Sequence, residues 1–422
     1  MNELHLDLVI IGGGPAGMAS AVSAFDLGII PTIIERDNDL GGILQQCIHP
    51  GFGLHVFDEE LTGPEFGERY KQLVIEKEIP VMFETIITEI NADKVITAYN
   101  PQQGLLKIHA KCIILAMGAR ERTRGTIKIP GARPSGVYTA GLAQRWINME
   151  GKMPGKDIVI LGSGDIGLIM ARRCTLEGAK VHRVVEILPY TSGLIRNKVQ
   201  CLEDFNIPLL LSHTVTHIHE DEGGRLKGVT IAQVDEKWIA IPGTDEFIPC
   251  DTLLLSVGLQ PEVDFALASG IEISACGGPT VDEKFRTTVP GIIACGNNLH
   301  IHDLVDNVTE EGSKAGIAAV MYLKNQLSDD SVIPVNAGKG ILYVVPHRMH
   351  NNAMKTEQAF QFRVRQPGEK VTLGIYSGDN LLKKTKMRHA LPSEMITLKT
   401  PPIEDPTLIN KEIHIEIISE ES

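Results

Sequence analysis

Two segments of the chain share one order of hydrophobic and polar positions. Each begins with an apolar, β-branched run, passes through a glycine-rich turn into small and apolar residues, and ends in a second apolar run that stops at a glutamate. The segments are LDLVIIGGGPAGMASAVSAFDLGIIPTIIE at 6–35 and KDIVILGSGDIGLIMARRCTLEGAKVHRVVE at 156–186. This order predicts a strand, a helix and a second strand in each segment.

Both turns carry the pattern G-x-G-x-x-G, and an acid follows each about 20 residues on, as in dinucleotide-binding units. Gly12 permits the tight turn, Gly14 lets the backbone approach a pyrophosphate, and Gly17 lets the helix pack close to the strand. The start of the helix then presents free N–H groups and a positive dipole end to phosphates. Glu35 is expected to accept hydrogen bonds from an adenosine ribose. The binding residues predicted in this unit are Gly12, Gly14, Pro15, Ala16, Gly17 and Glu35.

The second unit repeats these roles and indicates a second dinucleotide. Its carboxylate, Glu186, favours the free 2′-hydroxyl of NAD over the 2′-phosphate of NADP. A site for the 2′-phosphate usually has arginines just after the strand, whereas EILPY follows here and Arg183 lies on the strand itself. We therefore expect NAD(H). The binding residues predicted here are Gly162, Gly164, Asp165, Ile166, Gly167 and Glu186.

Other segments fill in the organisation of the chain. KCIILAMGAR (111–120) and CDTLLLSVGLQP (250–261) are typical of buried strands, and 287–323 predicts a strand, a loop and a long helix. The polar, glycine-bearing stretch 327–340 indicates a linker. Beyond it, ILYVV, AFQFRV, VTLGIYSG, MITL and EIHIEII are typical of short strands separated by turn residues, which predicts a small all-β module.

Composition narrows the range of partners and locations. The net charge of −13 argues against non-specific binding to nucleic acid or to an anionic membrane. The acidic start of the chain is unlike a secretory signal, and no apolar run approaches the ~20 residues of a membrane span. The 7 cysteines are scattered, without C-x-x-C, so neither a zinc site nor a disulfide framework is expected. A reducing cytoplasm is the predicted location.

The motifs resemble those of the two-dinucleotide flavoprotein superfamily, which has the pyridine nucleotide–disulfide oxidoreductase fold. GGGPAG is similar to its FAD motif, and ILAMGAR resembles its A-T-G motif, with Met117 in place of threonine. VPGIIACGN resembles its second FAD motif, in which an aspartate holds the ribityl chain; Asn297 stands there instead and can still hydrogen-bond a hydroxyl. The resemblance implies that Gly42, Gly118, Gly296 and Asn297 also bind FAD.

The fold implied is α/β, with two Rossmann-like dinucleotide-binding domains of the glutathione-reductase type and a small C-terminal all-β module. The FAD domain is expected to be discontinuous, at 1–121 and 259–327. The NAD domain is expected at 122–258, and the small β-rich domain at 335–422.

A narrower resemblance concerns GGILQQCIHPGFG, CGNNLHIHDLVDNVTEEG and the β-rich tail. These look like flavoprotein subunits found with glycerol-3-phosphate dehydrogenase-type flavoproteins in bacteria. More distantly, they resemble subunits of sarcosine oxidase and dye-linked proline dehydrogenase. The resemblance implies a multi-subunit complex in which a partner flavoprotein dehydrogenase and a small cysteine-rich protein join this chain. The expected function is FAD-dependent electron transfer between NAD(H) and a partner of the glycerol-3-phosphate or 2-hydroxyacid dehydrogenase kind.

Cys47 stands alone where a disulfide reductase of this build carries two cysteines four residues apart. Disulfide chemistry needs an attacking thiolate and a resolving thiol within reach, so we do not expect a disulfide reductase. Three interpretations of Cys47 stay open: a small packing residue beside the flavin, a redox cysteine that cycles through sulfenic acid, or a residue that assists a substrate reaction.

His49, His300 and His302 are the other candidate catalytic residues. IHPGFG and LHIHD each follow an FAD motif, so their histidines could line the flavin edge, donate hydrogen bonds or act as a general base. A helix that starts near Asp303 would point its N-terminus at the same region. The alternative is that the histidines are structural. We expect no metal site, because His300-x-His302 has no convincing further ligands in the sequence.

Three alternative functions are retained. They are an NADH oxidase or peroxidase that uses Cys47, an amine or amino-acid dehydrogenase subunit that oxidises its substrate at its own flavin, and a scaffold subunit that only holds cofactors. Two charged segments complete the picture. HEDEGGR (219–225) predicts a solvated hairpin turn, and LLKKTKMRHALP (381–392) predicts either a lysine-protected sheet edge or a docking surface for an acidic partner.

Overall fold

A computed structural model describes residues 2–327, 331–403, 405 and 411–418. The chain divides into two compact units. The first unit joins Met1–Ala119 to Pro261–Ser422, and the second is Arg120–Gln260. The chain passes between the units through β9 (Ala119–Glu121) and β18 (Leu259–Pro261), which pair with each other.

The first unit is built on a sheet that has seven strands within the described residues, in the order β5-β2-β1-β8-β7-β6, with β19 beside β8. β1, β2, β5, β8 and β19 are parallel, whereas β6 and β7 form an antiparallel edge. The parallel strands are apolar and buried, as expected for strands covered on both faces. Their bounds are β1 (Asn2–Ile11), β2 (Pro31–Ile34), β5 (Val81–Met82), β6 (Ile86–Ile90), β7 (Val95–Asn100), β8 (Gly104–Leu115) and β19 (Ile292–Ala294).

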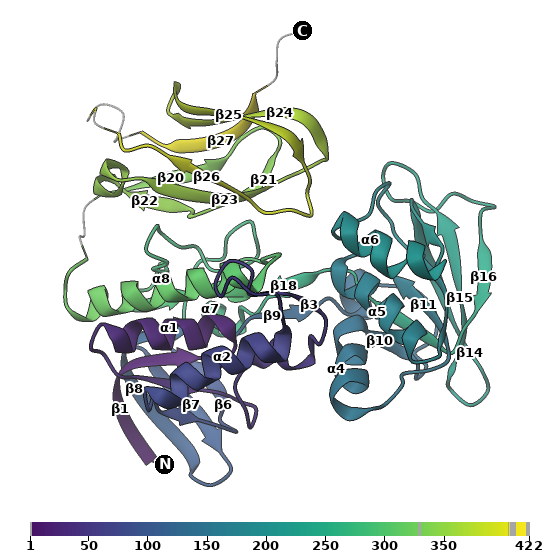
Figure 1. Ribbon diagram of the computed structural model, residues 1–422, viewed down its shortest axis with the longest axis horizontal. Helices are drawn as coiled ribbons and strands as arrows, with labels where there is room; N and C mark the ends of the chain where they lie inside the picture. The colour runs from purple at the N-terminus through teal and green to yellow at the C-terminus, as the bar shows by residue number, and fades with distance from the viewer. Residues whose placement is uncertain (1, 328–330, 404, 406–410, 419–422) are drawn as a thin grey trace. The chain divides into compact units, whose positions relative to one another are not determined.

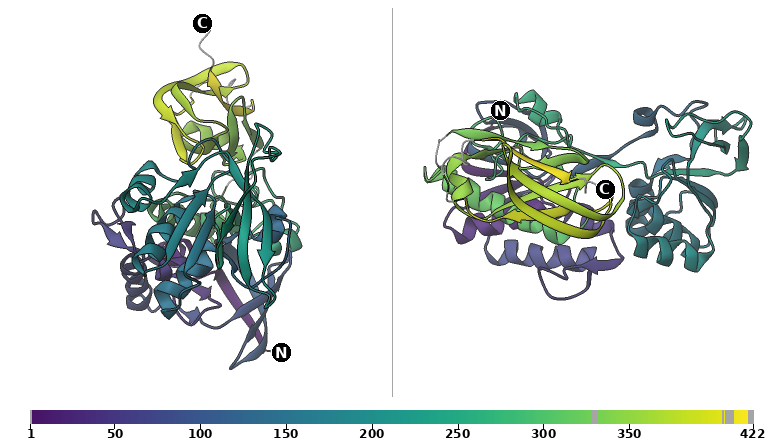
Figure 2. Two further views of the ribbon diagram at one scale, coloured as in Figure 1. Left: turned by 90° about the vertical axis from the view of Figure 1, so that its right-hand side faces the viewer. Right: turned by 90° about the horizontal axis from the view of Figure 1, so that it is seen from above.

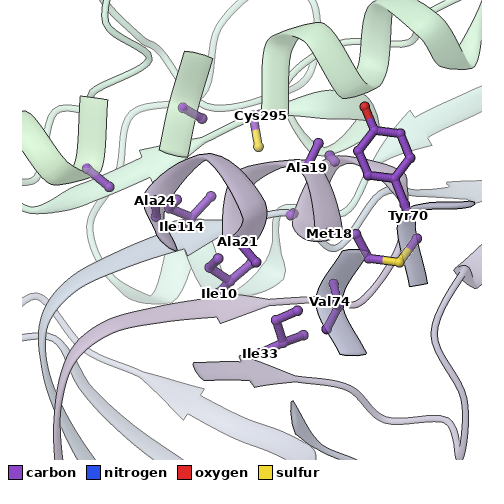
Figure 3. Close-up of a cluster of buried hydrophobic side chains, with 14 of the residues drawn as sticks. Ile10, Met18, Ala19, Ala21, Ala24, Ile33, Tyr70, Val74, Ile114 and Cys295 are labelled. Atoms are coloured by element: carbon purple, nitrogen blue, oxygen red, sulfur yellow. The ribbon is translucent and has the colours of Figure 1, made fainter. Parts of the chain in front are cut away.

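Two helices lie side by side on one face of this sheet, α1 (Pro15–Asp26) and α8 (Val305–Leu323) (Figure 1). They approach closely because α8 presents glycines to α1: a Cβ atom at Gly312 would lie 2.4 Å from the Ala16 carbonyl oxygen. α2 (Gly63–Glu76) completes this layer. Figure 3 shows the core beneath it, where Ile10, Ile33 and Ile114 of the sheet meet Met18 of α1.

The second unit carries a parallel sheet with five described strands in the order β10-β17-β11-β12-β13. Next to it in the chain is an antiparallel sheet, β14-β15-β16, whose β14–β15 turn confirms the hairpin predicted at 219–225. The strand bounds are β10 (Val137–Thr139), β11 (Asp157–Leu161), β12 (Lys180–Val185), β13 (Leu209–Leu210), β14 (His213–Glu220), β15 (Leu226–Gln233), β16 (Glu246–Pro249) and β17 (Thr252–Leu255). The helices are α3 (Arg124–Ile127), α4 (Ala140–Glu150), α5 (Asp165–Leu176) and α6 (Ile195–Cys201).

The C-terminal strands belong to the first unit but have a core of their own. They form two sheets, β22-β20-β27-β24-β25 and β21-β23-β26, seen in light green to yellow in Figure 2. Phe360 and Phe362 of one sheet and Leu373, Ile375 and Ile415 of the other share this core. The bounds are β20 (Val332–Ala337), β21 (Ile341–Val345), β22 (Arg348–His350), β23 (Gln358–Val364), β24 (Gly368–Ser377), β25 (Asn380–Ala390), β26 (Ile396–Thr400) and β27 (Ile413–Ile418).

One prediction in this region is wrong and another is confirmed. The stretch 327–340, expected to be a linker, contains β20, because Ile333 and Val335 are buried on one face of the sheet despite their polar surroundings in sequence. The basic segment 381–392 lies largely on β25, at the edge of its sheet, as the lysine-protected edge predicted. Within the described residues, the helices are all too short or too polar to cross a membrane.

Candidate functional site

The first glycine turn connects β1 to α1 and is closed by backbone at two of its three glycines. Gly12 has φ +103°, and a Cβ atom there would lie 2.5 Å from the Ala116 carbonyl oxygen. At Gly17 a Cβ atom would lie 1.9 Å from the Gly12 carbonyl oxygen. At Gly14, by contrast, no described protein atom lies within 4 Å of such a Cβ. The turn is therefore open only at the glycine that the sequence assigns to the pyrophosphate.

The N-terminus of α1 faces this open side. Gly14 is the N-cap, Pro15 occupies the first turn, and in the described structure the helix has no side-chain cap. Its first N–H groups therefore lack side-chain acceptors, which is the usual condition of a phosphate-binding helix start. Ala16 is buried under the turn, next to Gly312 of α8.

Glu35 directly follows β2 and is only 6% exposed. Its Oε2 atom accepts a 2.6 Å hydrogen bond from the Gly13 N–H, and its Oε1 atom accepts a 2.9 Å bond from the Asp37 N–H. Each carboxylate oxygen accepts from more than one direction, so these bonds orient the acid and keep capacity for hydroxyl donors. Gly42 (φ +52°) lies close by, since a Cβ atom there would be 3.2 Å from Gly14 Cα.

The second glycine turn repeats this arrangement between β11 and α5. A Cβ atom at Gly162 would lie 2.0 Å from the Ser256 carbonyl oxygen, and one at Gly167 would lie 2.7 Å from the Gly162 carbonyl oxygen. Gly164 is the N-cap of α5 and meets only ordinary contacts, at 3.5 Å or more. In the first turn of α5, Asp165 faces the loop that follows β12: its Oδ1 atom accepts hydrogen bonds from Leu194 N and Asn197 Nδ2 at 2.8 and 2.6 Å. Ile166 packs at the edge of the core of this unit.

Glu186 has more partners than the sequence predicted. Its Oε2 atom accepts hydrogen bonds from Ser163 N, Ser163 Oγ and Ser192 Oγ at 2.8, 2.6 and 2.9 Å, and Oε1 accepts from Leu188 N at 3.0 Å. The residue is 4% exposed. Sequence reasoning missed both serines, although Ser163 stands between the first two glycines of the motif. A ribose at this carboxylate would meet an acceptor that two hydroxyl groups already use.

The second FAD segment begins where β19 ends. Gly296 (φ +65°) opens a short 3-10 turn, η3 (Gly296–Asn298), and its N–H donates a 2.5 Å hydrogen bond to Glu311 Oε1 on α8. Asn297 is partly exposed, and its side-chain oxygen accepts a 3.0 Å bond from His302 N. Its Nδ2 group is then the donor that can meet a ribityl hydroxyl. Gly118 (φ +73°) follows β8 at the same end of the sheet, with open space among the described atoms around its Cβ position.

The structure brings His300 and His302 together but places His49 elsewhere. The rings of His300 and His302 are 4.2 Å apart between centroids, and both residues are buried. His300 Nε2 lies 3.0 Å from Glu311 Oε2, and burial followed by the nearby His302 lowers the pKa of His300. His49 is partly exposed and packs on Phe52, with a ring-centroid distance of 5.0 Å.

Glu311 is a central residue that sequence reasoning missed. It is 3% exposed, and burial works to raise its pKa. The combined charges and hydrogen bonds of His302 and His300 outweigh burial, so the pKa of Glu311 is lowered and the group is a carboxylate. The only signal in the sequence was its position on the helix after LHIHD, which fixes no contact by itself.

Two further residues tie this region to its surroundings. Asp306, in the first turn of α8, accepts hydrogen bonds from the backbone N–H groups of Gly53, His55 and Val56 at 3.0 to 3.1 Å. This holds the loop that follows Cys47 and His49 against α8. Arg363 of β23 donates to the Ile301 carbonyl oxygen at 3.0 Å and pairs with Asp303, which anchors the C-terminal strands on the histidine segment.

Cys47 directly follows η1 (Gly42–Gln46), and its carbonyl oxygen accepts a 2.8 Å hydrogen bond from Gly63 N. Burial raises the pKa of its thiol to about 12. All seven cysteines lie in the described part of the chain, and there they form no disulfide. A reactive cysteine needs a lowered pKa, so these observations favour the packing interpretation of Cys47.

Comparisons with known proteins identify the family. Residues 6–312 match the model of the family described as pyridine nucleotide-disulphide oxidoreductase, which is well over half of the chain. The chain belongs to this family. Its members are FAD-dependent oxidoreductases that use NAD(P)H. Membership confirms the predicted fold class and the expectation of FAD and a nicotinamide dinucleotide as cofactors.

Curated relatives within the family are distant and longer. The chain is 26% identical over 325 residues to the alkyl hydroperoxide reductase flavoprotein of Pseudomonas aeruginosa, covering 75% of this chain and 58% of that one. It is 24% identical over 350 residues to the glutamate synthase [NADPH] small chain of Mycobacterium tuberculosis, and 25% identical over 336 residues to one of the subunits of opine oxidase of Agrobacterium tumefaciens. In both, the match covers 75% of this chain and 66% of the relative. The chain thus spans less than two thirds of the length of these relatives.

Solved structures share the fold at low identity. Thioredoxin reductase of T. acidophilum superposes with a TM-score of 0.60 at 22% identity, covering 75% of this chain and 98% of that one. L-proline dehydrogenase from P. horikoshii gives a TM-score of 0.53 at 18% identity, covering 77% and 59%. The narrower group predicted from the sequence, subunits that accompany glycerol-3-phosphate dehydrogenase-type flavoproteins, stays a prediction.

The residues present fit FAD. The open space at Gly14 and Gly118 and the uncapped start of α1 suit a pyrophosphate that needs close backbone approach and N–H donors. The Glu35 carboxylate and the Asn297 amide supply an acceptor and a donor for the hydroxyls of ribose and ribitol. Nothing in this donor set needs the aspartate that usually stands at position 297.

Proposed function

We propose that the chain is an FAD-dependent oxidoreductase that moves electrons between NAD(H) and a partner flavoprotein of the glycerol-3-phosphate or 2-hydroxyacid dehydrogenase kind, without a redox disulfide. The observation that carries this proposal is the state of Cys47: a thiol whose pKa burial raises to about 12, in a chain whose described cysteines form no disulfide. Disulfide exchange needs a thiolate. Another carrier must therefore exchange electrons with the flavin.

The chain's own residues bind and orient the cofactors. The first glycine turn and α1 hold the FAD pyrophosphate, and Glu35 holds its ribose. When bound, FAD accepts a hydride and passes electrons to a second carrier. In the second unit, Gly164 and the start of α5 bind the pyrophosphate of the nicotinamide nucleotide. Glu186 binds the free 2′-hydroxyl and repels a 2′-phosphate, which supports NAD(H) over NADP(H).

The proposed partner is a second protein chain. Several relatives are named as parts of larger enzymes, namely a small chain of glutamate synthase and subunits of alkyl hydroperoxide reductase and opine oxidase. These names support an assembly for this chain also, and a small cysteine-rich protein is a further proposed member. We expect the assembly in the cytoplasm, where the cysteines stay reduced.

The first experiment mixes the FAD-loaded protein with stoichiometric NADH in the absence of oxygen and follows the visible absorbance of the flavin. We expect rapid bleaching with NADH and slower bleaching with NADPH. Cys47→Ser is the matched control and should bleach at the unsubstituted rate. Loss of bleaching in Cys47→Ser would favour the oxidase or peroxidase function. No bleaching of the unsubstituted, FAD-loaded protein by NADH would overturn the proposal for the isolated chain.

A second candidate is oxidation of an amine or amino acid at the flavin of this chain. The similarity to opine oxidase, whose name refers to an amine substrate class, favours it. The same anaerobic assay separates the two candidates. Bleaching by a secondary amino acid such as sarcosine or proline without NADH supports the second candidate, whereas bleaching by NADH alone supports the first.

A further inference from the structure

Three side chains in the first unit form a buried histidine–glutamate cluster: His300, His302 and Glu311. The histidines follow η3, and Glu311 lies on α8. The exposed side-chain fraction is 0% for both histidines and 3% for Glu311. His300 Nε2 lies 3.0 Å from Glu311 Oε2, and His302 Nε2 lies 3.4 Å from the same oxygen.

Hydrogen bonds leave this cluster incomplete. Both ring nitrogens of His302 and the Nδ1 atom of His300 have no hydrogen-bond partner among the described residues. Buried polar groups without partners are rare and costly, so a site that leaves three such atoms calls for a missing partner. The nearby cation does not serve here, because Arg363 pairs with Asp303. A positive ion between the three side chains would satisfy the Glu311 charge and the His302 Nε2 atom together.

The spacing suits a metal ion. Zinc binds imidazole nitrogen and carboxylate oxygen at about 2.0–2.2 Å, and ligands at the corners of a tetrahedron of that size lie roughly 3.3–3.5 Å apart. The 3.4 Å separation from His302 falls in this range, and the 3.0 Å separation from His300 needs only a small shift. Two histidines and one carboxylate are also a ligand set that proteins use for zinc and other divalent transition metals.

We propose that His300 Nε2, His302 Nε2 and Glu311 Oε2 bind a divalent transition-metal ion, with zinc as the best match, and that water completes the site. The ion would fix the second FAD segment. Glu311 uses its other oxygen to accept the Gly296 N–H, and the backbone N–H of His302 donates to Asn297. A metal on these ligands would therefore hold Gly296 and Asn297 in place through direct contacts, as a structural metal does.

Two other groups of candidate ligands make useful contrasts. Glu3, His5 and His109 lie at or near the surface of β1 and β8, where water can satisfy them. The group of Asp282, Glu283 and His350 already contains a cation, because Arg286 bonds to Asp282 at 2.6 Å and contacts His350. Neither has the unsatisfied buried nitrogens of the histidine–glutamate cluster.

The test measures metal in the full-length, FAD-loaded protein, purified without a histidine tag, incubated with zinc and then dialysed against a chelator. Elemental analysis compares the unsubstituted protein with His302→Ala, Glu311→Gln and the control His109→Ala, which alters the exposed group. We expect near-stoichiometric zinc in the unsubstituted protein and in His109→Ala, with at least a tenfold loss in the other two. Zinc retained by His302→Ala and Glu311→Gln but lost from His109→Ala would overturn the proposal.

X-ray absorption at the zinc edge of the unsubstituted protein keeps the test decisive if the cluster variants fail to fold. Two imidazoles and light-atom ligands around tightly held zinc support the proposal. A protein that takes up no zinc, or holds it without imidazole, contradicts it. Because none of these measurements uses NADH, the metal proposal and the proposed function can fail independently.

Discussion

Glu35 and Glu186 end equivalent strands in the two dinucleotide-binding units, and each is nearly buried. Glu35 accepts hydrogen bonds from two backbone N–H groups. Glu186 accepts from two backbone N–H groups and also from the hydroxyls of Ser163 and Ser192. The first carboxylate is thus oriented by backbone alone, whereas the second is partly occupied by side chains that can rotate away.

The helices that carry the two turns also differ in their neighbours. α1 is locked against α8: Ser20 Oγ donates to the carbonyl oxygens of Ala16 and Gly312, each at 2.8 Å. At the start of α5, Asp165 instead faces the loop that ends at Leu194. The same sequence motif therefore serves a rigid site suited to a resident cofactor and a more adjustable site suited to one that exchanges. The predictions below test this contrast, from the largest expected effect to the smallest.

Gly17→Ala should be the most damaging change. Its Cβ atom would lie 1.9 Å from the Gly12 carbonyl oxygen, a backbone atom that cannot move without opening the turn. We expect the free energy of unfolding, measured by urea denaturation, to fall by about 1–3 kcal/mol or more, with loss of bound FAD. In the second unit, Gly167→Ala should cost less, because its closest contact is 2.7 Å.

Gly14→Ala is the matched control for the first turn. No described protein atom lies within 4 Å of the new Cβ atom, so the cofactor-free protein should unfold within about 0.5 kcal/mol of the original. Only the affinity for FAD should drop, as measured by the dissociation of FAD after dilution. If Gly17→Ala and Gly14→Ala were equally stable without FAD, the closed and open positions of the turn would have been assigned wrongly.

Exchanging each glutamate for glutamine should separate the two sites. Glu186→Gln removes a charged acceptor worth about 1.5–3 kcal/mol, which corresponds to a loss of roughly tenfold or more in NADH affinity, and it should narrow the preference over NADPH. Its FAD content should stay unchanged. Glu35→Gln should show the reverse pattern. Stopped-flow titration gives the NADH affinity, and absorbance after denaturation gives the FAD content; equal loss of both cofactors in either variant would contradict separate roles.

Ser192→Ala tests whether the hydroxyl competes with the ribose for Glu186. Its Oγ atom donates a 2.9 Å hydrogen bond to the same carboxylate oxygen that Ser163 uses. Removing one competing donor, worth about 1 kcal/mol, should tighten NADH binding a few-fold in the same titration. Weaker binding would mean that Ser192 orients the carboxylate, and the second site would then be as rigid as the first.

Cys47→Ser should have the smallest effect, with unchanged NADH bleaching. The thiol reacts as its thiolate, and a pKa of about 12 leaves roughly one thiolate in 10,000 at pH 8. Alkylation of Cys47 by iodoacetamide, followed by mass spectrometry, should therefore be slow at neutral pH and still rise with pH beyond about 10. A plateau near pH 8 would show an activated thiol and revive the redox interpretation.

Several features of the molecule were readable from local pattern. The two units, their glycines and their terminal glutamates could be predicted because a tight turn with positive φ at Gly12 and Gly162 tolerates little else. The strands at 341–345, 358–364 and 413–418 followed from alternating or apolar runs. β20 was missed, because only its packing on the C-terminal core outweighs its polar, glycine-bearing setting in the sequence.

The candidate site was predicted less completely. His300 and His302 were predicted to act together, and they do lie together, but their partner Glu311 comes from the next helix. His49 was grouped with them by its distance from an FAD motif, and it packs on Phe52 instead. Asp306 and Arg363 fix loops from across the first unit, and no spacing along the chain announces such contacts.

The sequence by itself determined where the backbone can approach a phosphate and which residues end the strands beside it, because glycine conformation and strand polarity are local properties. Only the tertiary structure decided which donors fill each carboxylate, how strongly burial raises the pKa of Cys47, and that a glutamate on α8 joins two histidines from the preceding loop. Those outcomes depend on side chains from distant parts of the chain that folding brings within a few ångströms. Desolvation and hydrogen bonding act only at such distances.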